Sequence, residues 1–357
     1  MVSESPPFWW TKIGWQAALL SPASLIYSAV AGWRMRRARR APVDCPVVCV
    51  GNFTVGGAGK TPTVIAIAQA AAALGYKPGL LSRGYSGLIS KPTIVDPHHH
   101  RAVDVGDEPL LLARAGLTVV ARNRLEGAKK LIAEGADLII MDDGFQSARI
   151  AIDYALVVVD GKRGIGNGLV VPSGPVRAPL KEQLRHVTTL LAVSGGPAAD
   201  PFIRRMARAG KPVLEAGVAP VNGSEFAGKR LFAFAGIADP AKFYKSLADV
   251  GAEVVATRAF PDHHHFAEDE IRSLCVDAER DGLLPVTTAK DRVRLAGHHG
   301  AMNELIERIR VLDIEMKFDD PAAPCLIVEQ AFANFRKRKF ALKKPASTKK
   351  PVSAQRR

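Results

Sequence analysis

A glycine-rich loop between an apolar run and a helical stretch constrains this chain more than any other feature. Residues 46–51 read PVVCVG, residues 52–62 read NFTVGGAGKTP, and a helical pattern follows over residues 63–74. A strand, a glycine-rich turn, Gly-Lys-Thr and a helix form the setting of a phosphate-binding loop, because backbone amides and the helix N-terminus then face the anion. The pattern therefore predicts a nucleotide site at this loop.

The loop residues expected to bind the nucleotide are consecutive: Thr54, Val55, Gly56, Gly57, Ala58, Gly59, Lys60 and Thr61. The glycines allow the backbone to close around phosphate oxygens. Lys60 is expected to reach the β- and γ-phosphates, and Thr61 to place its hydroxyl on Mg²⁺. Thr54 stands where the usual pattern has glycine.

A pair of acids supports a metal-dependent nucleotide site. Residues 136–141 form an apolar strand pattern that ends in Asp142 and Asp143. Strands often end in acids because they meet solvent there. Downstream of a phosphate loop, however, a carboxylate in this position holds Mg²⁺. We therefore predict a metal-side role for both acids.

The order of the remaining patterns predicts the fold class. Apolar strand patterns at 80–82, 119–121, 155–159 and 189–193 alternate with helical stretches. This alternation is typical of an α/β protein with a mostly parallel sheet, here of the P-loop NTPase type. Ligands of such sheets bind at the carboxyl ends of the strands. A length of 357 residues suggests two domains.

Basic residues gather at the two ends of the chain. Of a net charge of +14, residues 1–41 contribute +5 and residues 336–357 contribute +10, which leaves about −1 for residues 42–335. A neutral body argues against the basic groove of a nucleic-acid enzyme, so no nucleic-acid partner is expected. Basic ends suit an anionic membrane surface. The low-complexity segment 336–357 is predicted to be disordered.

The first of these ends contains an uncharged run of 21 residues, Ile13–Trp33. It could be a signal peptide, a membrane-spanning helix, a helix in the membrane interface or a helix packed on the protein's own core. A signal peptide would export the nucleotide loop into a space without ATP. We favour the interfacial helix, with basic residues as its anchors.

This interfacial helix is expected to begin at Ser21 as N-cap, with Pro22 in its first position. Ile26, Val30 and Trp33 then fall on one face. Indole rings favour the membrane–water interface, and all four tryptophans lie in this part of the chain: Trp9, Trp10, Trp15 and Trp33.

Two segments offer acids or histidines for the acceptor side of a phosphoryl transfer. Asp107 and Glu108 begin a helical stretch, where they could position an attacking hydroxyl or merely complement the helix dipole. Asp262 precedes three histidines, 263–265; a histidine beside a carboxylate can orient a base, although a polar turn would look the same. Arg83 and Arg163 lie in glycine-rich loops that suit phosphate or sugar contacts, although ordinary loop structure alone would give the same pattern.

The nucleotide base is only partly readable. Residues 288–291 read TAKD, which lacks the spacing of the guanine-reading NKxD signature, so ATP is favoured over GTP. The four cysteines show no CxxC spacing and predict neither a zinc site nor a disulfide framework.

Taken together, these segments resemble the tetraacyldisaccharide 4'-kinase family of lipid A synthesis. The matching segments occur in order between residues 51 and 291: GNFTVGGAGKTP, LSRGYSG, GDEP, DDGFQ, DGKRGIGNG, PSGPVRAPL, FAGIADPAKF, FPDHH and TTAKD. The resemblance implies ATP-dependent phosphorylation of the 4'-hydroxyl of tetraacyldisaccharide 1-phosphate, with Mg²⁺, to give lipid IVA. It implies a lipid substrate and an anionic membrane surface as partners, no obligate protein partner, and a place at the cytoplasmic face of the bacterial inner membrane.

The resemblance also implies residue roles. Asp107 would be the catalytic base, His263 the residue that orients or tunes it, and Lys60 a phosphate-binding catalytic group. Asp142 and Asp143 match the metal-side acids of the family. The positions taken as possible substrate contacts are Arg83, Tyr85, Gln146 and Arg177.

The family's fold implies four parts for this chain: a membrane-associated segment over 1–41, a P-loop kinase domain over 42–225, a smaller α/β domain over 226–335 and the tail. Strands of the smaller domain are expected at 230–235, 253–257, 284–287 and 312–316. The chain departs from the family pattern at Ala178, where glutamate is usual, and at Ser147, where histidine is usual.

The alternative function is a membrane-positioned switch ATPase or GTPase. It would explain the phosphate loop and the amphipathic N-terminus. It would not explain the second glycine-rich loop at 163–168 or the Asp-His cluster at 262–265.

Overall fold

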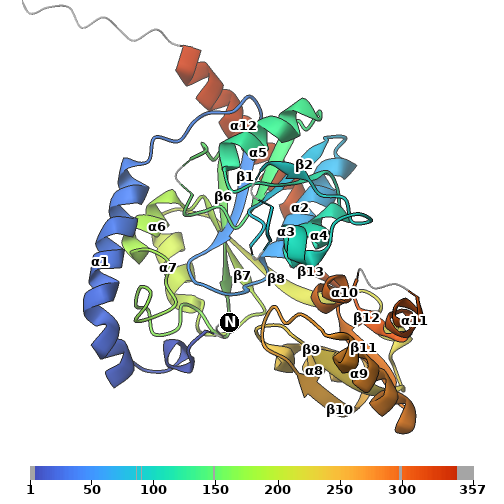
Figure 1. Cartoon of the computed structure of the whole chain (residues 1–357). Helices are drawn as coiled ribbons and strands as arrows, with labels where there is room; N and C mark the ends of the chain where they lie inside the picture. The colour runs from blue at the N-terminus through green and yellow to red at the C-terminus, as the bar shows by residue number, and fades with distance from the viewer. Residues whose placement is uncertain (1–4, 86, 90, 148, 297–299, 344–357) are drawn as a thin grey trace, which may run out of the picture.

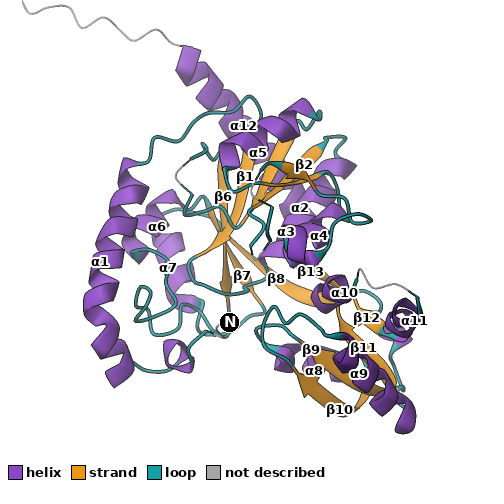
Figure 2. Ribbon diagram, viewed as in Figure 1, coloured by secondary structure: helices purple, strands orange, loops and turns teal. Residues whose placement is uncertain are grey.

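The phosphate loop follows Val47–Asn52, which is the middle strand of a nine-stranded sheet and is labelled β1 in Figures 1 and 2. The computed structural model describes residues 5–85, 87–89, 91–147, 149–296 and 300–343. In spatial order the strands are β13 (Ile314–Phe318), β8 (Val213–Pro220), β7 (Thr189–Val193), β6 (Tyr154–Asp160), β1 (Val47–Asn52), β5 (Leu138–Asp142), β2 (Pro78–Ser82), β4 (Thr118–Val120) and β3 (Thr93–Ile94). Only the outermost pairs, β13 with β8 and β3 with β4, are antiparallel. The predicted mostly parallel α/β sheet is confirmed.

Helices cover both faces of this sheet, as its uninterrupted apolar strands require. Every residue of β1 is buried. Val47 and Cys49 pack toward α5 (Arg124–Ala133), α6 (Leu180–His186) and α7 (Asp200–Arg208), whereas Val48 and Val50 pack toward α2 (Lys60–Ala73), α4 (Asp107–Ala113) and α12 (Ala323–Lys343). The short helix α3 (Ala102–Val105) precedes α4. The carboxyl ends of β1, β5 and β6 are thereby fixed side by side.

A second sheet of four parallel strands forms a smaller unit beside the first (Figure 1). Its order is β10 (Glu253–Ala259), β9 (Arg230–Ala235), β11 (Leu284–Thr288) and β12 (Arg310–Leu312). Phe232 and Phe234 pack toward α9 (Glu268–Arg280) and α11 (Ala301–Arg308), and Leu231 and Ala233 toward α8 (Pro240–Asp249). The remaining elements here are η2 (Gly223–Glu225) and α10 (Ala289–Leu295).

The elements after the small sheet return to the large one. β13 pairs with β8, and α12 packs on α2. The smaller domain expected over 226–335 therefore ends between Leu312 and Ile314. The strand expected at 312–316 is two strands in different sheets. The physical reason is that Met316 and Phe318 complete the apolar cluster under α2.

The disorder predicted for residues 336–357 is wrong over its first part, because α12 continues to Lys343. Arg338 donates to the buried carboxylate of Asp153 at 2.7 and 2.9 Å and to the carbonyl of Val43. One residue of the basic run therefore holds the helix on the body. Residues 344–357 lie outside the described residues.

The N-terminal helix α1 (Trp15–Arg37) lies along one side of the large domain, after the short helix η1 (Pro7–Trp10) (Figure 1). One side of it is buried against the body, at Ala17, Ser24, Gly32 and Met35. The Ser24 hydroxyl donates to the carbonyl of Val170 at 2.6 Å. Most of the large apolar side chains of α1 are instead exposed: Trp15, Leu19, Leu25, Ile26, Tyr27, Val30 and Trp33.

This helix begins six residues before the predicted start at Ser21, so Pro22 lies inside it. The missing amide of Pro22 would leave the carbonyl of Ala18 without a donor, but the Ser21 hydroxyl donates to that carbonyl at 2.7 Å. The predicted shared face is confirmed, since Ile26, Val30 and Trp33 are all exposed. Within the described residues, α1 included, no helix has the length and apolar content needed to cross a bilayer.

Candidate active site

The phosphate loop has the backbone that its glycines predict. Gly56 and Gly59 have φ angles of +106° and +88°, in the left-handed region that favours glycine. Thr54 has no positive φ; it forms an antiparallel bridge with Val176, so the loop has no need of glycine there. The departure from the usual pattern is thus compatible with a complete phosphate loop.

The loop and the acid pair, predicted from separate segments, lie together. Lys60 begins α2, and its Nζ donates to the Gly56 carbonyl at 3.2 Å and lies 3.9 Å from Asp143 Oδ2. The Thr61 hydroxyl donates to Asp142 Oδ2 at 3.4 Å. Both α2 residues are buried. The carboxyl end of β5 therefore faces the first turn of α2.

Asp142 is a buried carboxylate that the protein leaves partly unpaired. Its side chain is 1% exposed, and Oδ1 has no hydrogen-bond partner among the described residues. Burial, with a contribution from Glu108, raises the pKa of Asp142 to about 7. A cation beside this carboxyl would favour its ionised form. The donor set therefore fits Mg²⁺, which Asp142 and Thr61 would hold.

Mg²⁺ usually takes one or two carboxylates and keeps waters and substrate phosphates as its other ligands. In the part of the chain that the structure describes, no group of three or more His, Cys, Asp or Glu side chains could hold a metal ion alone.

Asp143 is held differently from its neighbour. It has a φ of +50° and forms a two-pronged ion pair with Arg177, at 2.6 and 2.9 Å. Arg177 also donates from Nε to the Thr54 carbonyl at 2.8 Å. Burial would raise the pKa of Asp143, but Lys60 and Arg177 together lower it to about 2. Arg177, expected as a substrate contact, thus connects Asp143 to the phosphate loop.

Further polar residues fix the backbone around these acids. Arg124, which sequence reasoning missed, is buried at the start of α5 and donates to the carbonyls of Asp142 and Asp143 at 3.2 and 3.3 Å. Its position just after a strand at the carboxyl edge of the sheet was the available signal. Gln146, another expected substrate contact, donates to the Asn52 carbonyl at 2.7 Å and to Gln183 at 2.9 Å.

On the acceptor side, Asp107 begins α4 and is 3% exposed. Its Oδ2 accepts from Arg294 Nε at 3.1 Å and also contacts Arg294 Nη2. His263 Nδ1 lies 3.2 Å from the same oxygen, within ion-pair distance but without the alignment of a hydrogen bond. The structure thus brings the predicted pair Asp107 and His263 together and adds Arg294, which the sequence analysis missed.

The surroundings shift the pKa values of Asp107 and His263 in opposite directions. Burial would raise the pKa of Asp107, but His263, Lys290 and Arg294 hold it far below the usual range. The Asp107 carboxylate in turn raises the pKa of His263, against the effect of burial. Asp107 is therefore ionised at neutral pH, with a proton favoured on the imidazole.

The acceptor side faces the metal side. Glu108 pairs with Lys290 at 2.9 Å, and both act on the pKa of Asp142, Glu108 raising it and Lys290 lowering it. Lys60 also lowers the pKa of Glu108. The start of α4 and the start of α10 consequently belong to the same site as the phosphate loop.

The other predicted residues lie at the rim or outside. Arg83 and Tyr85 are exposed, and the Tyr85 ring lies 5.7 Å from the His263 ring. His264 pairs instead with Glu270 at 2.9 Å.

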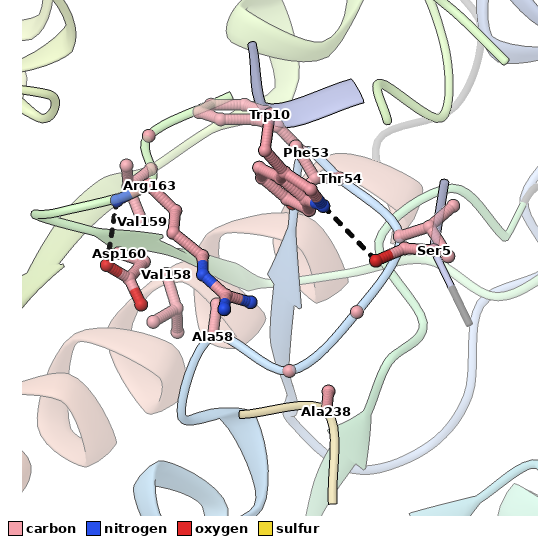
Figure 3. Close-up of a pocket in the computed structure, with 14 residues that line it drawn as sticks. Ser5, Trp10, Phe53, Thr54, Ala58, Val158, Val159, Asp160, Arg163 and Ala238 are labelled. Atoms are coloured by element: carbon pink, nitrogen blue, oxygen red, sulfur yellow. Dashed lines mark hydrogen bonds between the residues drawn. The ribbon is translucent and has the colours of Figure 1, made fainter. Parts of the chain in front are cut away.

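A pocket opens beside the phosphate loop (Figure 3). Its walls come from the N-terminal segment, the loop, β6 and the smaller domain: Ser5, Trp10, Phe53, Thr54, Val55, Gly56, Gly57, Ala58, Val158, Val159, Asp160, Arg163, Gly164 and Ala238.

Known proteins resemble this chain in sequence and in fold. A sequence model of the family described as "Tetraacyldisaccharide-1-P 4'-kinase" matches residues 16–332. The tetraacyldisaccharide 4'-kinase of Agrobacterium fabrum is 61% identical over 95% of this chain and 97% of its own length. That of Rhizobium meliloti is 59% identical over 96% and 99%. The crystal structure of LpxK from Aquifex aeolicus in complex with ATP has the same fold, with a TM-score of 0.69 and 23% identity over 88% of this chain and 99% of that one.

Proposed function

This chain belongs to the tetraacyldisaccharide-1-P 4'-kinase family, and from that premise we propose that it transfers the γ-phosphoryl group of ATP to the 4'-hydroxyl of tetraacyldisaccharide 1-phosphate, a step of lipid A biosynthesis. One observation supports this most directly. An Asp–His pair, the buried Asp107 with the partly exposed His263, shares a site with the phosphate-loop residue Lys60 and the carboxylate of Asp142. A donor side and an acceptor side are what in-line transfer between two substrates requires.

Asp107 acts on the attacking hydroxyl mainly by positioning it. A carboxylate with so low a pKa is a weak base, but the transition state of phosphoryl transfer is loose and demands little proton removal before bond breaking. Arg294 fixes the carboxylate from one side. His263 keeps it ionised, and the hydroxyl proton passes to the Asp107 carboxylate as the new oxygen–phosphorus bond forms and the bond to the leaving ADP breaks.

Lys60 neutralises charge on the transferred group. Its Nζ lies at the phosphate loop, 3.2 Å from the Gly56 carbonyl oxygen and 3.9 Å from Asp143 Oδ2. Mg²⁺ bound with ATP would offset the negative charge of the phosphates. Thr61 and Asp142 would hold it, and Asp143 would orient Lys60 through their ion pair.

The lipid acceptor resides in a membrane, so the enzyme has to work at a membrane surface. The exposed apolar side chains of α1, with Arg34, Arg36 and Arg37 in its last turn, suit a helix that lies in the interface of an anionic bilayer. We place the protein at the cytoplasmic face of the bacterial inner membrane, where ATP is present. Trp15 and Trp33 are the exposed indoles of this helix.

The decisive experiment is transfer of label from γ-labelled ATP to tetraacyldisaccharide 1-phosphate in detergent with Mg²⁺. Lys60→Ala and Asp107→Ala are each expected to lower kcat by at least about 100-fold, the scale of losing one transition-state group. Asp249→Ala is the matched control, because Asp249 forms an exposed ion pair with Lys245 away from the site; it should retain full activity.

The same assay distinguishes the kinase from the alternative function. ATP hydrolysis by the wild type without any phosphorylated lipid would reject the kinase and support a switch ATPase.

A further inference from the structure

The segment before α1 is fastened to the glycine-rich loop at residues 161–168. The Trp9 indole donates to the Pro172 carbonyl at 2.9 Å, and the Asn167 amide donates to the Trp9 carbonyl at 2.8 Å. Gly166 has a φ of +58°, and a Cβ there would lie 2.2 Å from the Trp9 carbonyl oxygen. Glycine is therefore required at this position both for its backbone and for the close approach of η1.

This fastening brings Trp10 to the pocket beside the phosphate loop. Trp10 donates from its indole nitrogen to the Ser5 hydroxyl at 3.1 Å, and both residues line the pocket. Figure 3 shows the indole and Arg163 on the same side of the loop that carries Thr54 and Ala58. Neither Trp9 nor Trp10 is among the exposed apolar side chains of the N-terminal segment.

Arg163 connects three parts of the molecule at this point. Its guanidinium carbon lies 5.5 Å from the centre of the Trp10 ring, and its Nη2 lies 2.9 Å from Asp239, just before α8 of the smaller domain. Its own loop is held by Asp160, which accepts from the Arg163 amide at 3.0 Å and pairs with Lys242. The guanidinium thus stands at the pocket between the indole and the smaller domain.

We propose that Trp10 is a positioning residue of the nucleotide site: its indole holds the Arg163 guanidinium beside the phosphate loop, where that charge favours the polyphosphate of ATP. The inference rests on the proposed function, because it takes ATP as the ligand of this loop. It assigns to the N-terminal segment a role in nucleotide binding besides contact with the lipid surface. An arginine attracted to the face of an indole keeps the donors that Asp239 does not occupy available for an anion, whereas a free side chain would lose rotamer entropy on binding.

The test is ATP affinity measured by calorimetry on the full chain, with a non-hydrolysable ATP analogue and Mg²⁺ and without lipid. Trp10→Ala is expected to weaken binding by about 3- to 30-fold, the range of a cation–π contact. Trp10→Phe, which keeps an aromatic face, should restore most of the affinity. In the kinase assay the loss should appear in KM for ATP, with kcat and KM for lipid nearly unchanged.

Arg163→Ala should weaken binding by at least as much as Trp10→Ala, and the double variant should be no weaker than Arg163→Ala alone. Arg258→Ala is a matched control: Arg258 lies 5.6 Å from the Phe232 ring and 2.9 Å from Asp277, with a similar side-chain exposure of 39% against 36% for Arg163, but it is not at the pocket. Its ATP affinity should equal that of the wild type.

Three outcomes would overturn the proposal: unchanged affinity in Trp10→Ala, equal losses in Trp10→Ala and Trp10→Phe, or losses that simply add in the double variant. Its failure is distinct from failure of the proposed function. If the wild type bound no nucleotide, both the kinase function and the role of Trp10 would be rejected. If the wild type bound ATP only as tightly as Trp10→Ala does, the role of Trp10 alone would be rejected.

Discussion

Asp107 and Asp142 are both buried carboxylates at the edge of one site, yet their protonation is shifted in opposite directions. Burial alone would raise both pKa values. For Asp142 burial prevails and the pKa rises to about 7, whereas for Asp107 the neighbouring cations prevail and the pKa falls. The difference lies in the partners rather than in the depth of burial.

The partners come from different parts of the fold. Asp142 lies at the end of β5 within the large sheet, and one of its oxygens lacks a hydrogen bond among the described residues. Asp107 lies where the two units meet, and Arg294 and His263 reach it from the smaller one. The large domain thus leaves one carboxylate partly unpaired, and the contact between domains keeps the other ionised, as the roles proposed for Asp142 and Asp107 require. Three substitutions test this contrast.

The largest effect is expected for Arg294→Ala. Arg294 pairs with Asp107 and, at 2.8 Å, with Asp291, and all three side chains are buried. Its removal leaves two buried carboxylates without this cation, so the free energy of unfolding should fall by about 3–5 kcal/mol in urea titrations. Arg308→Ala removes an exposed pair with Glu279 and should change stability little. A small loss in Arg294→Ala would show that Asp107 does not depend on this partner.

Asp142→Asn should instead raise the free energy of unfolding. Because the pKa of Asp142 in the folded protein is about 7, above the ordinary value near 3.9, the carboxyl opposes folding increasingly as pH rises between these two values. In the absence of nucleotide, the substitution should therefore stabilise the protein at pH 8 by on the order of 2 kcal/mol, and by less at pH 5. Phosphoryl transfer should be lost.

The neighbouring acid provides the control for this prediction. The pKa of Asp143 is lowered to about 2, so its ionised form stabilises the fold above the ordinary carboxyl pKa, and this contribution disappears as pH falls toward 2. Asp143→Asn should therefore destabilise the protein at pH 8. If Asp142→Asn and Asp143→Asn changed the free energy of urea unfolding in the same direction, the contrast between paired and unpaired carboxylates would be refuted.

The sequence predicts the surroundings of Asp142 far better than those of Asp107. Lys60, Asp142 and the central strands could be recognised because each lies in a local pattern, and buried parallel strands are continuous apolar runs. Arg294 could not, since it lies 187 residues from Asp107 and only the packing of two domains brings them together.

Element boundaries show the same limit. The start of α1 was misplaced because Ser21 and Pro22 form a typical helix beginning, yet the Ser21 hydroxyl can also replace the missing proline amide inside a helix. The end of the smaller domain differs from the expectation because the alternating apolar residues of 312–316 do not tell which of two sheets they will join. Local chemistry was readable in both places, but the tertiary partner was not.

The smallest effect should come from Glu108→Gln. Glu108 is adjacent to Asp107 in the chain and also acts on the pKa of Asp142. Glu108 raises the pKa of Asp142 and pairs with Lys290, which lowers it. Neutralising Glu108 removes the first effect and leaves the second, so the pKa of Asp142 should move down toward its ordinary value. Carboxyl carbon NMR of aspartate-labelled protein would follow it, with the Asp142 signal assigned from the spectrum of Asp142→Asn.

Glu126→Gln is the matched control, because Glu126 is an exposed acid in the first turn of α5. It should leave the titration of Asp142 unchanged. If Glu108→Gln also left it unchanged, burial alone would account for the raised pKa, and the acceptor side would not influence the metal side. A downward shift would instead mean that the charge of Glu108 at the start of α4 acts on the carboxyl of Asp142 at the end of β5.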